Sequence, residues 1–74
     1  MILQILELHK NLRKDECVKI IGLNDYETYL DKADLISKTE EPEVLRIVGI
    51  NGRTAAVNCN HIIAACVTKK IWRD

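Results

Sequence analysis

Apolar and polar residues alternate with a short period along most of this chain, and the alternating pattern occurs twice. The run 18–37 matches the run 45–64 at one constant offset of 27 residues without a gap (45 − 18 = 27). The identical pairs under this offset are Ile20/Ile47, Gly22/Gly49, Asn24/Asn51 and Ile36/Ile63. A period of two is typical of half-buried strands, so we interpret the chain as a duplicated β unit.

Each copy predicts three short strands bounded by turn residues. The predicted strands span 17–23, 26–31 and 35–39 in the first copy and 44–50, 53–58 and 62–70 in the second. Turns are predicted at Asn24-Asp25 and at Asn51-Gly52, where Asn-Gly favours a hairpin in which both residues adopt positive φ. The polar stretch 40–43 contains the only proline and joins the copies. Gly22 and Gly49, within strands, indicate a bend or bulge.

The N-terminal segment 1–14 has apolar residues at helical spacing and predicts an amphipathic helix. These residues are Ile2, Ile5, Leu6 and Leu12. A β-strand over 1–8 is the alternative, because periodicity does not decide so short an apolar run. The apolar arc from Leu8 round to Leu3 covers roughly 220°, more than one core contact requires. We therefore expect one of these two margins to face a second subunit or a partner protein.

The expected fold class is mainly β (α+β), in one domain over 1–74. The N-terminal helix would accompany two repeated β units, spanning 17–39 and 44–70, that form a small SH3-like barrel or two packed three-stranded sheets. With 74 residues, 47% of them apolar and none Phe, the core must be thin and aliphatic. A chain of this size buries only about 60% of its unfolded surface, so extra burial from self-association is expected.

Charge does not favour a dedicated nucleic-acid binder, because 11 basic residues balance 11 acidic ones. A local basic strand face remains an alternative. Lys19 and Arg46 are equivalent by the repeat, and Arg53 follows the second turn. These three residues are the candidate contacts for an anion or a nucleic acid.

Candidate chemistry is sparse. Three cysteines without Cys-x-x-Cys spacing argue against a disulfide framework or a zinc site. A strand would place Cys59 and His61 on one face, but a catalytic pair also needs an orienting acid and an oxyanion hole. We therefore predict no catalytic residues, no metal and no cofactor. Trp72, beside basic residues in the tail, is a candidate interface anchor because tryptophan is enriched among binding hot spots.

The apolar run 2–8 is too short to span a bilayer and no basic residue precedes it, so a soluble cytoplasmic protein without membrane insertion is expected.

Several short motifs, taken together, resemble a known family. They are Gly22-Leu23-Asn24-Asp25, Tyr29-Leu30, Ala33-Asp34-Leu35-Ile36, Glu41-Pro42 and Ile50-Asn51-Gly52. Over residues 18–57 this pattern resembles the short bacterial flagellar and swarming-motility proteins of the FlbD type, with Asp25 where that pattern has glycine. The resemblance implies a small cytoplasmic β protein that contacts other proteins, in that family in a supporting role at the flagellar motor.

The function expected from these features is that of a non-enzymatic regulatory module of bacterial or phage origin. It would self-associate as a homo-oligomer through the N-terminal helix and would bind and modulate a protein partner. The alternative is a small nucleic-acid- or nucleotide-binding protein that uses the basic strand face. The sequence leaves the identity of the partner open.

Overall fold

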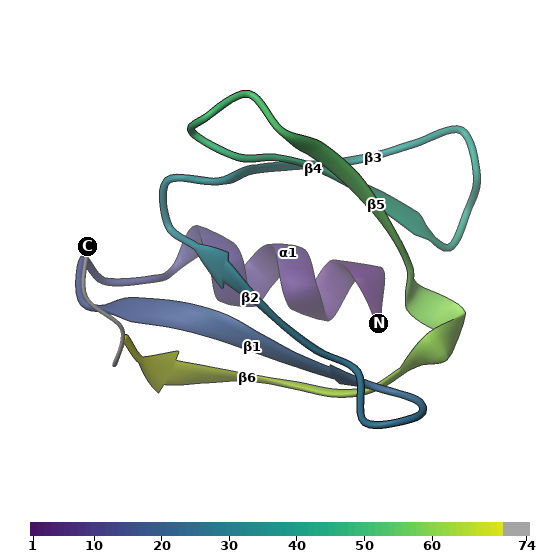
Figure 1. The fold of residues 1–74 in the computed structure, drawn as a ribbon, viewed down its shortest axis with the longest axis horizontal. Helices are drawn as coiled ribbons and strands as arrows, with labels where there is room; N and C mark the ends of the chain where they lie inside the picture. The colour runs from purple at the N-terminus through teal and green to yellow at the C-terminus, as the bar shows by residue number, and fades with distance from the viewer. Residues whose placement is uncertain (71–74) are drawn as a thin grey trace.

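The structure is a computed structural model in which residues 1–70 are described. One N-terminal helix is followed by six strands and a short 3₁₀ turn, η1 (Figure 1). In chain order the elements are α1 (Ile2–Lys10), β1 (Glu16–Gly22), β2 (Glu27–Asp31), β3 (Leu35–Lys38), β4 (Val44–Val48), β5 (Thr54–Asn58), η1 (Cys59–His61) and β6 (Ile62–Lys69). Each observed strand lies within two residues of its predicted bounds at either end.

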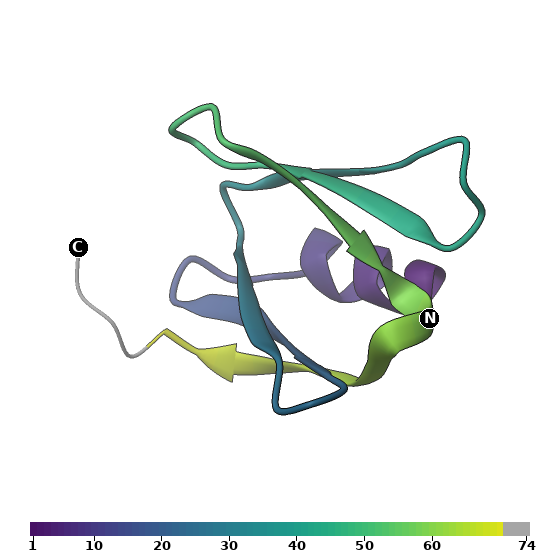
Figure 2. The same ribbon diagram turned by 45° about the vertical axis from the view of Figure 1, so that its right-hand side comes forward.

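The strands form two antiparallel three-stranded sheets, in the orders β2-β1-β6 and β3-β4-β5. The sheets face each other, one above and one below α1 in Figure 2. Alternate residues of each strand point into the space between them, where Val18 and Ile20 of β1 and Leu45 of β4 are fully buried. The predicted α+β class with two packed three-stranded sheets is confirmed.

The two hairpins have the same register, as the sequence repeat predicts. In β1–β2, Ile20 lies opposite Thr28, and in β4–β5, Ile47 lies opposite Ala55. Adding the offset to the first pair gives the second (20 + 27 = 47 and 28 + 27 = 55). The first two strands of each copy are therefore equivalent in structure as well as in sequence.

The third strands are exchanged between the copies. β3 pairs with β4, and β6 pairs with β1, so each third strand joins the first strand of the other copy. The offset would place Ile63 opposite Ile20, but Ala65 occupies that position. The displacement accompanies the η1 turn and a register shift between Ile21 and Gly22, where the sequence predicts a bend or bulge. Because the displacement is two residues, each side chain keeps its face of the sheet.

The N-terminal helix is confirmed, and the alternative strand over 1–8 is wrong. The helix ends at Lys10, so the predicted bound at residue 14 is wrong too. The Asn11 side-chain amide donates to the carbonyl oxygen of Glu7 at 3.1 Å and satisfies a carbonyl of the last turn. Leu12 then turns into the core, where it is buried.

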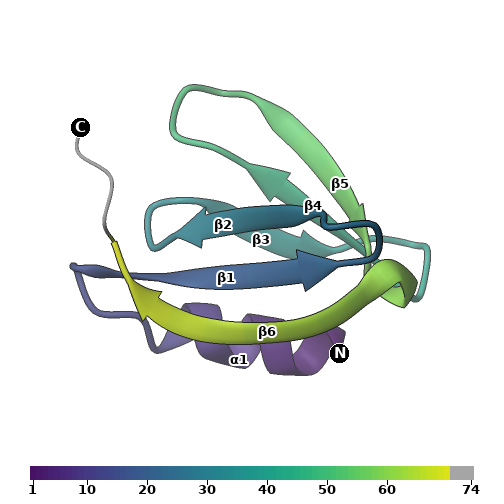
Figure 3. The same cartoon turned by 60° about the horizontal axis from the view of Figure 1, so that its bottom comes forward.

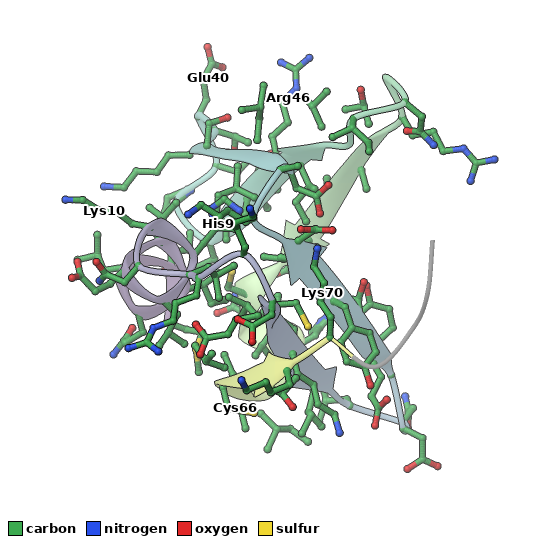
Figure 4. All side chains as sticks on the ribbon, turned by 90° about the vertical axis from the view of Figure 1, so that its left-hand side faces the viewer. His9, Lys10, Glu40, Arg46, Cys66 and Lys70 are labelled. Carbon is green, nitrogen blue, oxygen red and sulfur yellow. The ribbon has the colours of Figure 1, made fainter. Side chains whose placement is uncertain are left out.

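Helix α1 fills one of the two open sides of the sandwich. It packs against β1, β6 and β3, and it is seen end-on between the sheets in Figure 4. The buried core cluster comprises Ile2, Ile5, Leu12, Val18, Ile20, Leu30, Leu45 and Cys59. Within residues 1–70 no helix is both long enough and apolar enough to cross a membrane.

The two hairpin loops differ in backbone conformation. Asn24 and Asp25 both have positive φ, at 58° and 63°. In the second loop Gly52 has a φ of 83° but Asn51 does not take a positive value, so the predicted Asn-Gly turn with two positive φ angles is wrong. The Gly52 N–H donates to the carbonyl oxygen of Gly49 at 2.9 Å and closes a turn over residues 49–52, which leaves Gly52 in a left-handed bulge position.

Candidate interaction surfaces

The two margins of α1 have different environments. Leu8 is half-buried and packs against the core cluster. Leu3 is 67% exposed, and Met1 beside it is also exposed. The sequence predicted that a single sheet could not bury both margins, and the structure identifies Leu3 as the side chain left outside.

Leu3 lines a hollow of about 530 Å³ between the start of α1 and the β3–β4 loop. The opposite wall includes Lys38, Thr39, Pro42 and Glu43. The Thr39 hydroxyl donates to the carbonyl oxygen of Val44 at 3.0 Å and accepts the Glu41 N–H at 3.1 Å. These bonds hold the β3–β4 loop in a defined shape. The hollow therefore combines apolar side chains of α1 with polar groups of a loop whose conformation is fixed by hydrogen bonds.

A groove of similar volume, about 530 Å³, lies on the opposite open side of the sandwich. It is lined by Leu23, Asn24 and Tyr26 of the β1–β2 hairpin, by Ala56, Val57 and Asn58 of β5, and by His61 and Ile62. Leu23 is 51% exposed and Tyr26 is 48% exposed. Large apolar side chains therefore remain accessible on the wall opposite β5.

Close backbone contact fixes the inner end of this groove. The Leu23 N–H donates to the carbonyl oxygen of His61 at 3.0 Å and ties η1 to the β1–β2 hairpin. A Cβ atom at Gly22 would lie 3.0 Å from that oxygen and 2.9 Å from the Tyr26 ring. The missing side chain at Gly22 thus permits the hairpin and η1 to approach each other.

The three candidate anion contacts lie apart. Lys19 is on the outer face of the β1 sheet, in the row of Cys66, and its Nζ lies 3.5 Å from the Glu27 carboxylate. Arg46 is on the outer face of the other sheet, and Figure 4 shows it on the side opposite Cys66. Arg53 lies in the β4–β5 loop. The pseudo-symmetry that makes Lys19 and Arg46 equivalent places them on opposite surfaces.

Two further lysines are held in ion pairs. Lys69 Nζ lies 2.8 Å from the Asp15 carboxylate, which lowers the pKa of Asp15 and raises that of Lys69. Lys70 Nζ lies 3.0 Å from the Asp31 carboxylate. The predicted anchor Trp72 lies outside the described residues.

The backbone of Asp31 forms two hydrogen bonds with side chains at the turn between β2 and β3. Its N–H donates to the Asp34 carboxylate at 2.9 Å, and its carbonyl oxygen accepts from Nε2 of His9 at the same distance. Partial burial raises the pKa of the Asp31 carboxyl, but the hydrogen bond from Lys70 and backbone N–H groups outweigh it and hold the pKa below its usual range. The turn is thereby fastened to the end of α1.

The three thiols have different environments. Burial raises the pKa of Cys17 and of Cys59, and Cys66 is exposed. Cys59 and His61 lie in η1 instead of on a strand, with Cys59 buried and His61 exposed, so the predicted shared face is wrong. In the described part of the chain no group of three or more His, Cys, Asp or Glu residues could hold a metal ion.

The sequence pattern indicates neither the hollow beside Leu3 nor the groove beside β5, because each brings together segments that are far apart in the chain. The one local indication of the groove is the composition of β5, whose five residues include no charged side chain. Comparisons with protein-family models, curated proteins and solved structures gave no match to this chain.

Proposed function

We propose that this chain is a non-enzymatic interaction module that self-associates and that binds and modulates a protein partner. The exposed margin of α1 is the surface that contacts the partner. The observation that carries the proposal is the unequal burial of Leu3 and Leu8. The helix is anchored in the core by one margin while it presents an apolar side chain at the other.

The hollow beside Leu3 supports this assignment. An apolar side chain of a partner would contact Leu3 and Met1, while polar groups of the β3–β4 loop would bind its backbone. Such a combination of an apolar centre and a polar rim is common in protein–protein interfaces. The neighbouring Lys38 and Glu43 carry opposite charges, so the surface selects a partner by shape and apolar contact more than by net charge.

The alternative, a nucleic-acid-binding strand face, gains no support from the arrangement of the basic residues. Lys19 and Arg46 are on opposite outer faces, whereas binding to a phosphate backbone draws on cations gathered along one surface.

The test compares Leu3→Glu with Leu8→Glu. Leu8→Glu should unfold the domain, because it places a carboxylate against the core cluster. Leu3→Glu should leave the far-ultraviolet circular dichroism spectrum and the melting temperature unchanged but abolish co-purification of the partner from the native cell. Leu35→Glu is the matched control, because Leu35 is 70% exposed and does not line the hollow.

The proposal fails if folded Leu3→Glu retains the same co-purified proteins as the wild type. It also fails if Leu35→Glu abolishes their retention as completely as Leu3→Glu does, because the loss would then not be specific to the α1 margin.

A further inference from the structure

Strand β5 has an unpaired edge whose hydrogen-bonding groups can be assigned. The bonds at the two ends of the β4–β5 ladder are from Gly49 N–H to Arg53 O at 2.8 Å and from Cys59 N–H to Glu43 O. In an antiparallel ladder, hydrogen-bonded and non-hydrogen-bonded pairs alternate. The outward-facing main-chain groups therefore belong to the three alternate residues Thr54, Ala56 and Asn58. Within residues 1–70 these groups form no backbone hydrogen bond to another segment.

The other three outer strands carry features that hinder edge-to-edge pairing. In β2, antiparallel self-pairing about Tyr29 would bring Glu27 opposite Asp31, and Asp31 is already bound by Asp34 and His9. β3 has four residues, ends in Lys38 and packs against α1. β6 lies alongside α1 in Figure 3 and ends in Lys69 after an irregular start. Short strands, charges, bulges and covering elements are the usual protections of sheet edges.

β5 has none of these protections. Its sequence Thr-Ala-Ala-Val-Asn contains no charge and no proline, and all of its residues except Val57 are exposed. It packs chiefly against β4 and stands at the outside of its sheet in Figure 3. An unprotected edge of this kind is a template for another strand.

We propose that a second copy of this chain pairs with β5 through its own β5, antiparallel, about a two-fold axis at Ala56. The two three-stranded sheets would join into one continuous six-stranded sheet. This inference rests on the self-association part of the proposed function and deepens it, because it assigns that contact to β5 and leaves the α1 margin for the partner protein.

The strand is complementary to itself in this register. Ala56 lies opposite its symmetry mate, and Thr54 lies opposite Asn58, so about six backbone hydrogen bonds form, two for each such pair. On the inner face Ala55 lies opposite Val57, which buries two apolar side chains against each other. Small residues at the axis let the backbones approach without a steric clash.

Charge does not oppose the pairing. Arg46 on β4 is the cation to consider in this register, because it lies opposite Ala56. The two Arg46 residues would be about 14 Å apart, three interstrand spacings. This separation exceeds the Debye length at physiological ionic strength, so their repulsion is screened.

The groove beside β5 gives an incoming strand room. Its β5 wall consists of Ala56, Val57 and Asn58, so the open space runs along the free edge. Leu23 and Tyr26 on the opposite wall would be covered by the second copy. Their exposure in the single chain is then accounted for by the dimer.

Sedimentation equilibrium of the wild type and of Ala56→Pro tests the pairing. Proline removes the outward N–H of residue 56 without removing a β4–β5 hydrogen bond, and edge positions tolerate proline. The wild type should form a reversible dimer between about 5 and 500 μM, a range suited to micromolar affinity. Ala56→Pro should remain a monomer with an unchanged circular dichroism spectrum. A monomeric wild type, or a folded Ala56→Pro that still dimerises, would overturn the proposal.

Cross-linking tests the register independently of the proline variant. Ala56→Cys places two thiols opposite each other at about 5.5 Å between Cα atoms, a distance that a disulfide spans. Thr54→Cys is the matched control, since its symmetry mate would be about 14 Å away along the strand. Both variants carry Cys66→Ser, because Cys66 is exposed. With oxidised glutathione, Ala56→Cys should give a covalent dimer and Thr54→Cys should not.

Other occupants of β5 would give different results. Assemblies larger than a dimer, or equal cross-linking by both variants, would contradict the two-fold register. A monomeric wild type that loses a foreign protein on Ala56→Pro but not on Leu3→Glu would show that a strand of another chain occupies the edge. Failure of the proposed partner surface is seen separately, because Leu3→Glu should leave the β5 dimer intact.

Discussion

Replacing Gly22 by alanine should weaken the contact that joins the β1–β2 hairpin to η1. The added Cβ would lie 2.9 Å from Cδ2 of Tyr26 and 3.0 Å from the carbonyl oxygen of His61. The ring can rotate away, but the carbonyl is part of the backbone and accepts the Leu23 N–H at 3.0 Å. Relief of the clash therefore requires η1 and the hairpin to separate.

The repeat supplies the matched control, Gly49→Ala. There the nearest atom is Oδ1 of Asn51 at 3.2 Å, which belongs to a side chain that can shift by a few tenths of an ångström. Gly22 and Gly49 both have negative φ, so alanine is allowed by the backbone at each site. Alanine also reduces the entropy of the unfolded chain, which stabilises the protein by about 0.4 to 1 kcal/mol.

Overpacking of a close contact costs about 1 to 3 kcal/mol, which exceeds the gain from the unfolded chain, so we expect Gly22→Ala to lose about 0.5 to 2 kcal/mol of stability. Gly49→Ala should remain within about 1 kcal/mol of the wild type because its two effects offset each other. Thermal and urea unfolding followed by circular dichroism measure the difference, at about 4 to 8 °C of melting temperature for each kcal/mol. Equal stability of the two variants would refute the assigned contact between η1 and the hairpin.

Three further predictions follow from burial and charge. Ile20→Ala should cost about 2 to 5 kcal/mol and Ile47→Ala clearly less, measured by urea unfolding, because Ile20 is fully buried and Ile47 is half-buried. Lys70 lowers the pKa of Asp31 in the folded protein. The ionised Asp31 carboxylate therefore stabilises the folded state above its unfolded pKa of about 3.9, and this contribution is lost as the pH falls through the folded pKa. Asp31→Asn should therefore flatten the fall in melting temperature below about pH 4. Cys66 should react first with iodoacetamide in the folded protein, and peptide mass analysis should find the other two cysteines protected.

Dimerisation through β5 would also add to the stability of a chain with a thin core. A partner that binds the folded state stabilises it by mass action, so the melting temperature of the wild type should rise with protein concentration. The buried core cluster contains no aromatic residue, and its largest members are Ile and Leu. Extra burial at an interface is a common way for small domains to become stable.

Local sequence determined the parts of the fold that depend on neighbouring residues. Period-two alternation gave the six strands, helical spacing gave α1, and the offset of 27 gave the matching registers of the two hairpins. The wide apolar arc of the helix also indicated that one of Leu3 and Leu8 would remain outside. Each of these features rests on contacts within a few residues along the chain, which side-chain pattern specifies directly.

Tertiary structure decided the features that depend on distant segments. A repeat in sequence does not determine whether β3 pairs with β1 or with β4, nor whether β6 pairs with β4 or with β1. The exchange of β3 and β6 between the copies joins both sheets around one core. The helix ends at Lys10, and the chain beyond it places Leu12 in that core. The two turns differ at the equivalent residues Asn24 and Asn51, of which only Asn24 has a positive φ, so the residue type alone does not set the turn. Lys19 and Arg46, equivalent in sequence, are separated because the two sheets face each other and direct their outer faces to opposite sides of the molecule.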